Sequence, residues 1–265
     1  MPRYLTRTPP PPGRLRVFCF PYAGGGASAY AGWQRRITAD AELLPVQLPG
    51  REGRMAEPRF TDLAALIADL DAELGPELDH PHVLYGHSMG ALIAFALAQH
   101  RHARGARLPA ALVLGGHRAP HLPAPLPDEP DIADADLVRT LDAYGGLPRI
   151  LLDHPEWLAA LLPIVRDDLR LCAAAPTVAR TPLPVALHAF GGAGDRLVTV
   201  PEVREWARYS TRESETVVVP GGHFFPREEP GFLDLLSAVL RRYEPAAAGT
   251  AGTVATAAAA PAGQG

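Results

Sequence analysis

Short apolar runs alternate along the chain with longer amphipathic stretches. Runs rich in β-branched and aromatic residues predict strands at 15–20, 43–48, 83–85, 110–114, 184–190 and 215–219. Apolar residues at helical spacing predict helices at 27–37, 61–74, about 90–100, 200–209 and 229–243. Pro45 places the second strand at an edge or irregular position, and Thr61 is the expected N-cap of the second helix. The alternation predicts an α/β fold with a mostly parallel, doubly wound sheet.

This rhythm breaks over residues 119–180. A proline-rich stretch, 120–130, precedes three short helical patterns that have no strand between them. Such an insertion predicts a helical cap (lid) over the active face of the sheet. Its large apolar residues have two readings, an acyl-chain channel or plain packing of cap on core, and packing is expected for most of them: Leu147, Leu151, Trp157, Leu161 and Leu162. The acidic pair Asp167-Asp168 is interpreted as a solvated face of the cap.

The two ends of the chain differ in composition from the rest. Residues 1–13 are proline-rich, which predicts an extended, poorly ordered leader. Residues 245–265 contain Ala, Gly, Thr and Pro with few large apolar side chains, which predicts a disordered tail. The segment between them, 14–244, is long enough for one domain that carries the cap as an insertion.

A serine lies between a predicted strand and a predicted helix. The run Val83–Tyr85 stops at Gly86, and Gly90 follows Ser88 before the helix. In a G-x-S-x-G turn of this kind the serine is held clear of the sheet, and the glycines allow strand and helix to cross closely. This context favours a nucleophile elbow. The alternative is that Ser88 only caps the helix.

A serine nucleophile needs a base, and the base needs a group that fixes its tautomer. Asp195 follows the strand that ends at 190, and His223 follows the strand that ends at 219. Parallel strands gather such loops at their carboxyl ends, so we expect Ser88, His223 and Asp195 to meet. The order Ser, Asp, His is that of the α/β-hydrolase fold. His117, which follows another strand end, is the rival base.

The remaining histidines are expected to have other roles. The side chain of His87 should point away from the apex of the turn, although it precedes the nucleophile. His82, His100 and His102 flank helix or strand ends and are expected to be solvated. For the oxyanion hole we expect the backbone N–H groups of Met89, directly after the nucleophile, and of Ala23, in the Gly-rich loop after the first strand.

Composition narrows the class of protein. The net charge of −4 leaves no electrostatic footprint for nucleic acid or an anionic membrane. No run of about 18 apolar residues could span a bilayer, and the N-terminus lacks the apolar core of a signal peptide. Two cysteines are too few for a disulfide framework, so a cytoplasmic protein is expected. No cluster has metal-ligand spacing, so neither metal nor cofactor is expected. A monomer is the default.

At these residues the sequence resembles a type II thioesterase, a stand-alone editing hydrolase of polyketide and nonribosomal peptide synthesis. The resemblance covers nearly all of residues 15–243. Its most specific parts are Phe20–Gly25, Gln47–Glu52 with Arg54 and Glu57-Pro58, Gly86–Gly90 and Gly221–Phe225. The cap stretch Leu162–Asp168 is also similar to the family, whereas Leu171-Cys172-Ala173 lacks the aromatic residue expected there.

The resemblance implies a substrate that the residues alone do not give. It implies an acyl group, stalled or aberrant and of short to medium chain, held as a thioester on the phosphopantetheine arm of an acyl or peptidyl carrier protein. Ser88 would attack the acyl carbonyl, His223 would take the proton, and water would release the acid. The alternatives are a carboxylesterase, a medium-chain thioesterase of fatty-acid synthase, and a non-catalytic relative that only binds a small molecule or partner.

Overall fold

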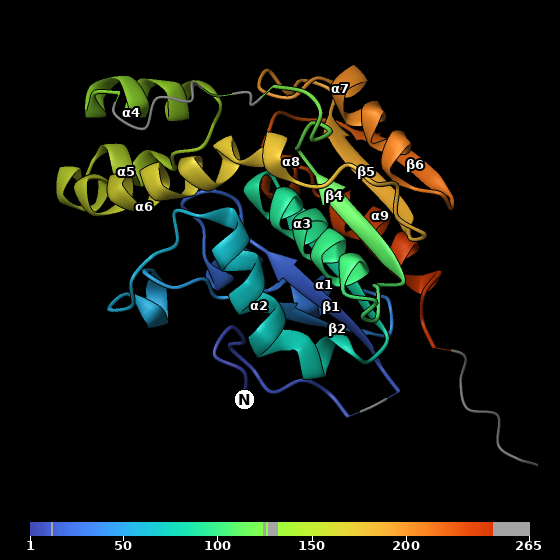
Figure 1. Cartoon of the computed structure of the whole chain (residues 1–265). Coiled ribbons are helices and arrows are strands. Elements are labelled where there is room, and N and C mark those ends of the chain that lie inside the picture. Colours follow the sequence, from blue (N-terminus) through green and yellow to red (C-terminus); the bar gives the residue numbers. More distant parts are fainter. Residues whose placement is uncertain (12, 124–125, 127–131, 246–265) are drawn as a thin grey trace, which may run out of the picture.

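The computed structural model describes residues 1–11, 13–123, 126 and 132–245 (Figure 1). Its six strands form one sheet in which every neighbouring pair is parallel. The strand order is β2-β1-β3-β4-β5-β6. The bounds are β1 Leu15–Phe20, β2 Ala41–Pro45, β3 His82–His87, β4 Ala111–Gly115, β5 Ala186–Gly192 and β6 Ser214–Val219. The predicted parallel α/β sheet is confirmed, and Pro45 lies on an edge strand, where its missing N–H leaves no central ladder bond unmade.

Helices cover both faces of the sheet. One face packs against α2 (Leu63–Leu78), α3 (Met89–Ala103) and α7 (Val200–Arg204), and the other packs against α1 (Trp33–Arg36) and α9 (Phe232–Arg241). Alternate residues of β1 enter different clusters, with Phe18 and Phe20 on the α3 side and Val17 and Cys19 on the α9 side. The short α8 (Phe225–Glu228) follows β6. A strand buried on both faces explains the continuous apolar runs of the sequence.

In the described part of the segment between β4 and β5, three α-helices form the cap, defined here as α4 (Asp134–Ala143), α5 (Arg149–Leu152) and α6 (Pro155–Ala173). They lie together at the upper left of Figure 1, and α6 packs against α3 on one face of the sheet. The cap has its own small apolar cluster, in which only Leu137, Leu162 and Val165 are buried among the described residues. Most of the proline-rich stretch that precedes the cap, residues 124–125 and 127–131, lies outside the described residues.

Two local predictions need correction. The helix predicted over 27–37 is a 3₁₀ turn, Ala27–Tyr30, followed by the four residues of α1. Gly32, with a φ of +79°, separates the two pieces, because a left-handed residue cannot continue a right-handed helix. The N-cap of α2 is Asp62 and not Thr61: its side chain accepts a hydrogen bond from the Ala65 N–H at 2.8 Å.

The N-terminal segment also differs from the poorly ordered leader expected for residues 1–13. Tyr4 and Leu5 are buried in the core, and Leu5 forms an isolated antiparallel bridge with Val46. The Tyr4 hydroxyl donates to Asp69 on α2 at 2.5 Å. Two large side chains outside the proline run are therefore enough to fasten this segment. The predicted disordered tail, 245–265, lies outside the described residues except for Pro245.

Within the described ranges, no helix is both long and apolar enough to cross a membrane.

Candidate active site

Ser88 stands at a strained turn between β3 and α3. Its φ of 54° and ψ of −121° are unusual for a residue with a side chain. The crossing of strand and helix leaves no room beside it: a Cβ on Gly86 would lie 2.0 Å from the Gly90 carbonyl oxygen, and one on Gly90 would lie 2.0 Å from that of Phe20. The two glycines are therefore required by close backbone contact. The side chain of Ser88 makes no capping bond to α3, which argues against the capping alternative.

The structure brings Ser88, His223 and Asp195 together. His223 Nε2 lies 3.1 Å from Ser88 Oγ, and His223 Nδ1 lies 2.8 Å from Asp195 Oδ2. The other carboxylate oxygen of Asp195 accepts the backbone N–H groups of Leu197 at 2.8 Å and Val198 at 3.0 Å. Because a carboxylate accepts only, it fixes the proton of His223 on Nδ1 and leaves Nε2 free to accept from the serine. This is the geometry of an activated hydroxyl nucleophile.

The rival base, His117, has a different environment. His117 lines the cavity that opens on Ser88, described below. Its Nδ1, however, lies 2.6 Å from the carbonyl oxygen of Arg118, and the hydrogen bond to Ser88 is made by His223. Burial lowers the pKa of His117 to about 4, so the ring is neutral near pH 7. The predicted choice of His223 over His117 agrees with this geometry.

His87 packs against His223, the histidine that contacts Ser88. Its ring centroid lies 5.3 Å from that of His223 and 5.2 Å from that of Phe225. Burial lowers the pKa of His87 well below its usual value, so no cation forms beside His223 near neutral pH. A Cβ on Gly116 would come within 2.5 Å of the ring, which shows how closely it is enclosed.

One expectation about the other histidines is wrong. His82 is buried, with 1% of its surface exposed, and is not solvated, because β3 begins at this residue and both faces of the strand are covered. Burial lowers its pKa to about 4. His102 is exposed and His100 partly exposed, as expected for residues near the end of α3.

The two residues expected to supply the amides of an oxyanion hole both lie near Ser88. Ala23 lies in the oxyanion loop, defined here as residues 21–27, and lines the cavity together with Ser88. Met89 is the first residue of α3, where a backbone N–H has no partner within the helix. Among the described residues, no recorded hydrogen bond uses either N–H. Neither N–H is therefore committed to another acceptor among these residues.

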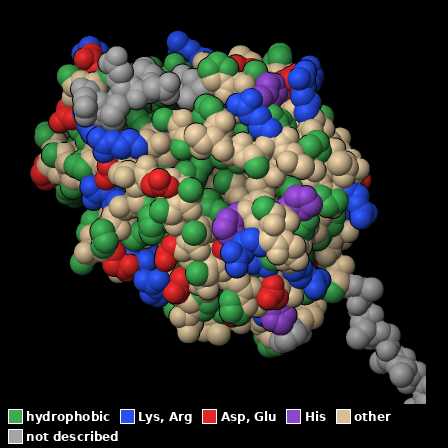
Figure 2. Space-filling model, viewed as in Figure 1, with side chains coloured by type: hydrophobic (Ala, Val, Ile, Leu, Met, Phe, Trp, Pro, Cys, Tyr) green, Lys and Arg blue, Asp and Glu red, His purple; other side chains and the backbone are tan. Residues whose placement is uncertain are grey.

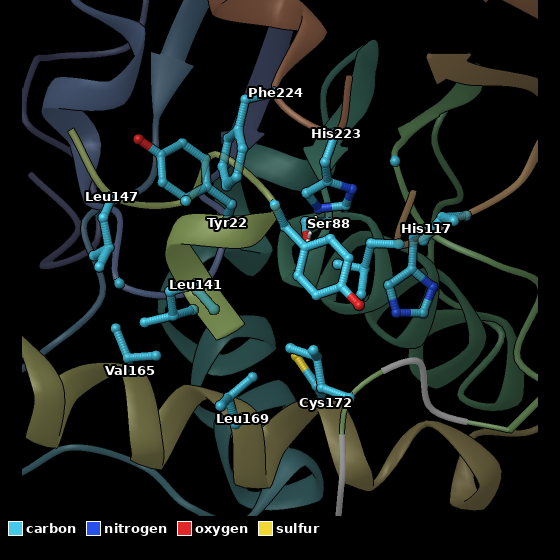
Figure 3. Close-up of a pocket in the computed structure, with 18 of the residues that line it drawn as sticks. Tyr22, Ser88, His117, Leu141, Leu147, Val165, Leu169, Cys172, His223 and Phe224 are labelled. Atoms are coloured by element: carbon cyan, nitrogen blue, oxygen red, sulfur yellow. Dashed lines mark hydrogen bonds between the residues drawn. The ribbon is translucent and has the colours of Figure 1, made fainter. Parts of the chain in front are cut away.

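A cavity of about 200 Å³ opens above Ser88, between the sheet and the cap. Figure 3 shows Ser88 and His223 at one side of it, with Leu141, Val165 and Leu169 of the cap across from them. In the space-filling view, hydrophobic side chains gather around a hollow near the centre of this face (Figure 2). The wall contributed by the cap and the connection between α4 and α5 is mostly apolar, and its members are Leu141, Tyr144, Gly146, Leu147, Pro148, Leu151, Leu161, Val165, Leu169, Cys172 and Ala173. Such a wall suits a hydrocarbon chain.

The cap residues singled out from the sequence divide between the two readings. Leu147, Leu151 and Leu161 line the cavity. Leu162 is buried in the cap's own cluster, and Trp157 is 49% exposed, stacked on His154. Hydrophobic character alone does not distinguish these positions, since the direction of each side chain depends on its place around the helix.

Cys172 lines the cavity, and it lies in the stretch Leu171–Ala173 that lacks the aromatic residue expected from the family resemblance. Burial raises the pKa of its thiol to about 12, so it is protonated near neutral pH and is a poor nucleophile.

The expectation that Asp168 is solvated is wrong. Its side chain is 1% exposed, and both of its oxygens pair with the guanidinium of Arg51, at 2.6 and 2.7 Å. Asp167, the other half of the acidic pair, accepts from Arg59 and Arg170 nearer the surface. The sequence reasoning missed this site because charge alone does not show which carboxylate faces inward. The usable signal was the presence of both Arg51 and Asp168 in motifs that resemble the family.

Comparisons with known proteins agree on one family. The model of the thioesterase domain family matches residues 15–245. The gramicidin S biosynthesis protein GrsT of Aneurinibacillus migulanus is 36% identical over 212 residues, which cover 80% of this chain and 83% of that protein. The structure of the RedJ thioesterase, from the prodiginine pathway of Streptomyces coelicolor, superposes with a TM-score of 0.80 at 36% identity, covering 86% of this chain and 90% of that one.

A third relative is described as a type II thioesterase. The structure of BorB, from the borrelidin biosynthetic cluster, superposes with a TM-score of 0.77 at 29% identity, and the match covers 90% of this chain and 98% of that one. The fold is that of the α/β-hydrolases, as the strand order and the serine turn indicate. The chain therefore belongs to the thioesterase domain family, and it is a hydrolase that acts on thioesters.

Proposed function

We propose that this enzyme hydrolyses acyl groups from the phosphopantetheine arm of acyl or peptidyl carrier proteins in polyketide or nonribosomal peptide synthesis. The observation that carries the proposal is the apolar cavity of about 200 Å³ that opens on Ser88, because it gives an acyl chain a place beside a serine already bonded to His223. The similarity to GrsT, RedJ and BorB supports the choice of pathway. We propose a monomer that acts in the cytoplasm.

In the proposed mechanism, Ser88, His223 and Asp195 are the catalytic residues. Ser88 Oγ attacks the thioester carbonyl while its proton passes to His223 Nε2, and the charge on the imidazolium is stabilised by Asp195. The carbonyl oxygen, now negative, accepts from the N–H groups of Ala23 and Met89. The C–S bond then breaks, the pantetheine sulfur leaves as a thiol with the proton from His223, and the acyl group stays on Ser88.

Water completes the reaction. His223 takes a proton from a water molecule, which attacks the acyl-serine ester, and the resulting acid leaves as Oγ regains its proton. A thiolate is a better leaving group than an alkoxide, so the first half of the reaction asks less of His223 as an acid than ester cleavage does. No step requires a metal or an organic cofactor.

A comparison of three substrates with one acyl group tests this function. We expect kcat/KM to fall in the order acyl-carrier protein, acyl-pantetheine thioester, simple oxygen ester, because each step removes binding contacts or a good leaving group. Ser88→Ala should abolish hydrolysis of all three, whereas Ser214→Ala, an exposed serine on β6, should retain it. A preference for the oxygen ester would identify a carboxylesterase. Binding of the carrier without Ser88-dependent hydrolysis would identify a non-catalytic relative.

The length of the acyl chain separates the proposed function from release of medium-chain fatty acids. The same assay is repeated on carrier proteins loaded with acetyl, butyryl, octanoyl and dodecanoyl groups. We expect measurable kcat/KM for the acetyl and butyryl groups. Turnover restricted to octanoyl and longer chains would contradict an editing role and would favour the fatty-acid synthase alternative.

A further inference from the structure

The cap touches the oxyanion loop at Gly24, the residue after the proposed oxyanion donor Ala23. The Gly24 N–H donates to Asp168 Oδ2 at 2.7 Å, and Asp168 lies on α6 of the cap. The backbone of Gly24, with a φ of +78°, also lies directly under α6: a Cβ there would be 2.8 Å from Val165 Cγ2 and 3.4 Å from Leu161 Cδ1. One hydrogen bond and one close apolar contact thus fix this point of the loop to the cap.

Arg51 contacts both Asp168 and the residue after Gly24. It follows β2 in the loop that leads to α2, and its guanidinium pairs with both oxygens of Asp168. Its Nη1 also donates to the Gly25 carbonyl oxygen at 3.1 Å. The Arg51 and Asp168 side chains are 5% and 1% exposed, so this ion pair is shielded from water. Together the two residues hold the backbone on both sides of the Gly24–Gly25 peptide.

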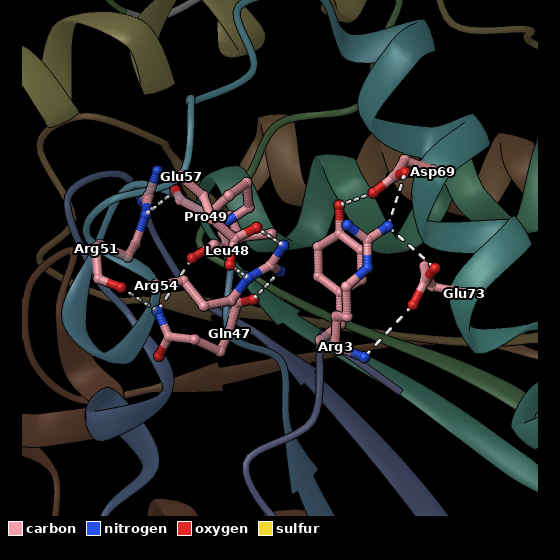
Figure 4. A network of polar contacts seen from close by, with 10 residues as sticks. Arg3, Gln47, Leu48, Pro49, Arg51, Arg54, Glu57, Asp69 and Glu73 are labelled. Carbon is pink, nitrogen blue, oxygen red and sulfur yellow. Dashed lines mark hydrogen bonds and ion pairs between the residues drawn. The ribbon is translucent and has the colours of Figure 1, made fainter. Parts of the chain in front are cut away.

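The loop that carries Arg51 is itself fastened to the oxyanion loop. The Gln47 side chain donates to the carbonyl oxygens of Leu48 and Arg51, both at 3.1 Å (Figure 4), and its Oε1 accepts from the Ala27 N–H at 3.1 Å. Glu52 accepts from the N–H and hydroxyl of Ser28. Arg51 is therefore a fixed point from which the oxyanion loop can be positioned.

The pairing also has an electrostatic consequence. A lone carboxylate bonded to Gly24 would repel the negative charge that develops on the substrate oxygen near Ala23. Because Arg51 is bound to both oxygens of Asp168, that charge is balanced within the site. The pair therefore supplies a fixed anchor without a net charge beside the oxyanion.

We propose that Arg51 and Asp168 are positioning residues that hold the Ala23 N–H in place as an oxyanion donor, so that the donor is in position only while α6 is seated on the oxyanion loop. This inference rests on the function proposed above and assigns a role to the Gln47–Glu52 and Leu162–Asp168 motifs. Neither residue contacts the reacting atoms. Both act through the backbone of the loop.

A double-mutant cycle separates positioning from stability. Either single change, Arg51→Met or Asp168→Leu, leaves a buried charge without its partner and should lower the melting temperature. The double variant R51M/D168L removes both charges, and such replacements are often neutral for stability. We expect the double variant to melt near the wild type while its kcat on an acyl-pantetheine thioester falls about 100-fold, the effect typical of a lost oxyanion donor. KM should change less than threefold.

Two further measurements make the result specific. R51M/D168N restores an oxygen that can accept from the Gly24 N–H, so its kcat should recover at least tenfold over R51M/D168L. The affinity for a trifluoromethyl ketone with the same acyl chain, which forms a tetrahedral oxyanion on the serine, should fall in proportion to kcat/KM. Rates are divided by the concentration of Ser88 that reacts with a fluorophosphonate, so unfolded protein does not contribute to kcat. Asp167→Asn, on the same helix but directed at Arg59 and Arg170, is the matched control and should retain kcat.

Wild-type kcat in R51M/D168L, or equal kcat in R51M/D168L and R51M/D168N, would overturn the inference. The outcome is independent of the carrier substrate, because the cycle can be repeated on any ester whose hydrolysis requires Ser88. Failure of the proposed function would instead appear in the wild type, as absent hydrolysis of acyl-carrier protein.

Discussion

The sheet and the cap hold the candidate site in different ways. The two faces of the sheet are covered by large buried clusters, and the sheet carries Ser88, Asp195 and His223 on loops that leave β3, β5 and β6. The cap has a cluster with only three buried members among the described residues, yet it supplies the apolar wall of the cavity. The difference indicates a rigid base for the chemistry beneath a thinner, less stable wall for the substrate.

The contact between these two regions includes a buried ion pair. The buried pair of Arg51 and Asp168 connects the cap to the oxyanion loop, at the two residues that follow Ala23. Hydrophobic contacts tolerate small displacements, whereas a bidentate ion pair has a narrow geometry. The structure therefore couples the thin region to the rigid one at a point where position matters for catalysis.

The largest effect is expected from a change in the rigid region. His223→Ala removes the base that lies 3.1 Å from Ser88, and kcat should fall by about 10⁴- to 10⁶-fold, as in other serine hydrolases. The rival His117→Gln should change kcat less than about tenfold, because His223 and not His117 is bonded to the serine. Steady-state kinetics on one acyl-pantetheine thioester makes the comparison. A larger loss in His117→Gln would show that the base was wrongly assigned.

A second prediction concerns the acid stability of the sheet. Burial lowers the pKa of His82 from 6.5 to about 4, so the unfolded chain binds a proton that the folded one does not between these pH values. The free energy of unfolding is therefore unaffected by this group above pH 6.5 and falls as the pH drops from 6.5 to 4, by about 3 kcal/mol in total. Urea titrations of wild type and His82→Gln at several pH values measure the difference.

The matched variant for this measurement is His102→Gln. His102 is exposed and lies near the end of α3, the helix that follows the strand β3 in which His82 is buried. Its unfolding free energy should follow the wild-type pH dependence, whereas that of His82→Gln should fall less steeply below pH 6.5. Parallel curves for all three proteins would contradict the account of His82.

The smallest effect is expected in the cap. Leu169→Phe adds volume to the cavity wall, so a dodecanoyl thioester should lose about tenfold in kcat/KM relative to an acetyl thioester. Leu152→Phe, a partly solvent-facing position on α5 outside the cavity wall, should leave this ratio unchanged. If the ratio of kcat/KM for the dodecanoyl and acetyl thioesters is equal in both variants, the cap does not bind the acyl chain.

The same contrast explains what could be predicted from the sequence. The six strands and the meeting of Ser88, Asp195 and His223 follow from short-range patterns together with one topological rule, that parallel strands end at one edge. The break of the 27–37 helix at Gly32 was missed because helical periodicity outweighed one left-handed glycine. The burial of Tyr4 and Leu5 was missed because the proline run beside them dominated the composition.

The cap shows where such reasoning stops. Asp168 and its partner Arg51 are 117 residues apart, and nothing local to either distinguishes Asp168 from its neighbour Asp167, which pairs with Arg59 and Arg170 instead. Leu161 and Leu162 are adjacent and equally apolar, yet one lines the cavity and the other packs within the cap. These outcomes depend on how α6 is rotated against the sheet, which is a property of the tertiary packing.

The central claim is that Ser88 receives the acyl group, and the most direct test is to find that group on the protein. The enzyme is mixed with excess acyl-pantetheine thioester, quenched in acid during turnover, digested and analysed by mass spectrometry. The account predicts the acyl mass on the peptide that contains Ser88 and its loss in Ser88→Ala. An acyl group on Cys172, or steady hydrolysis with no acylated residue, would contradict it.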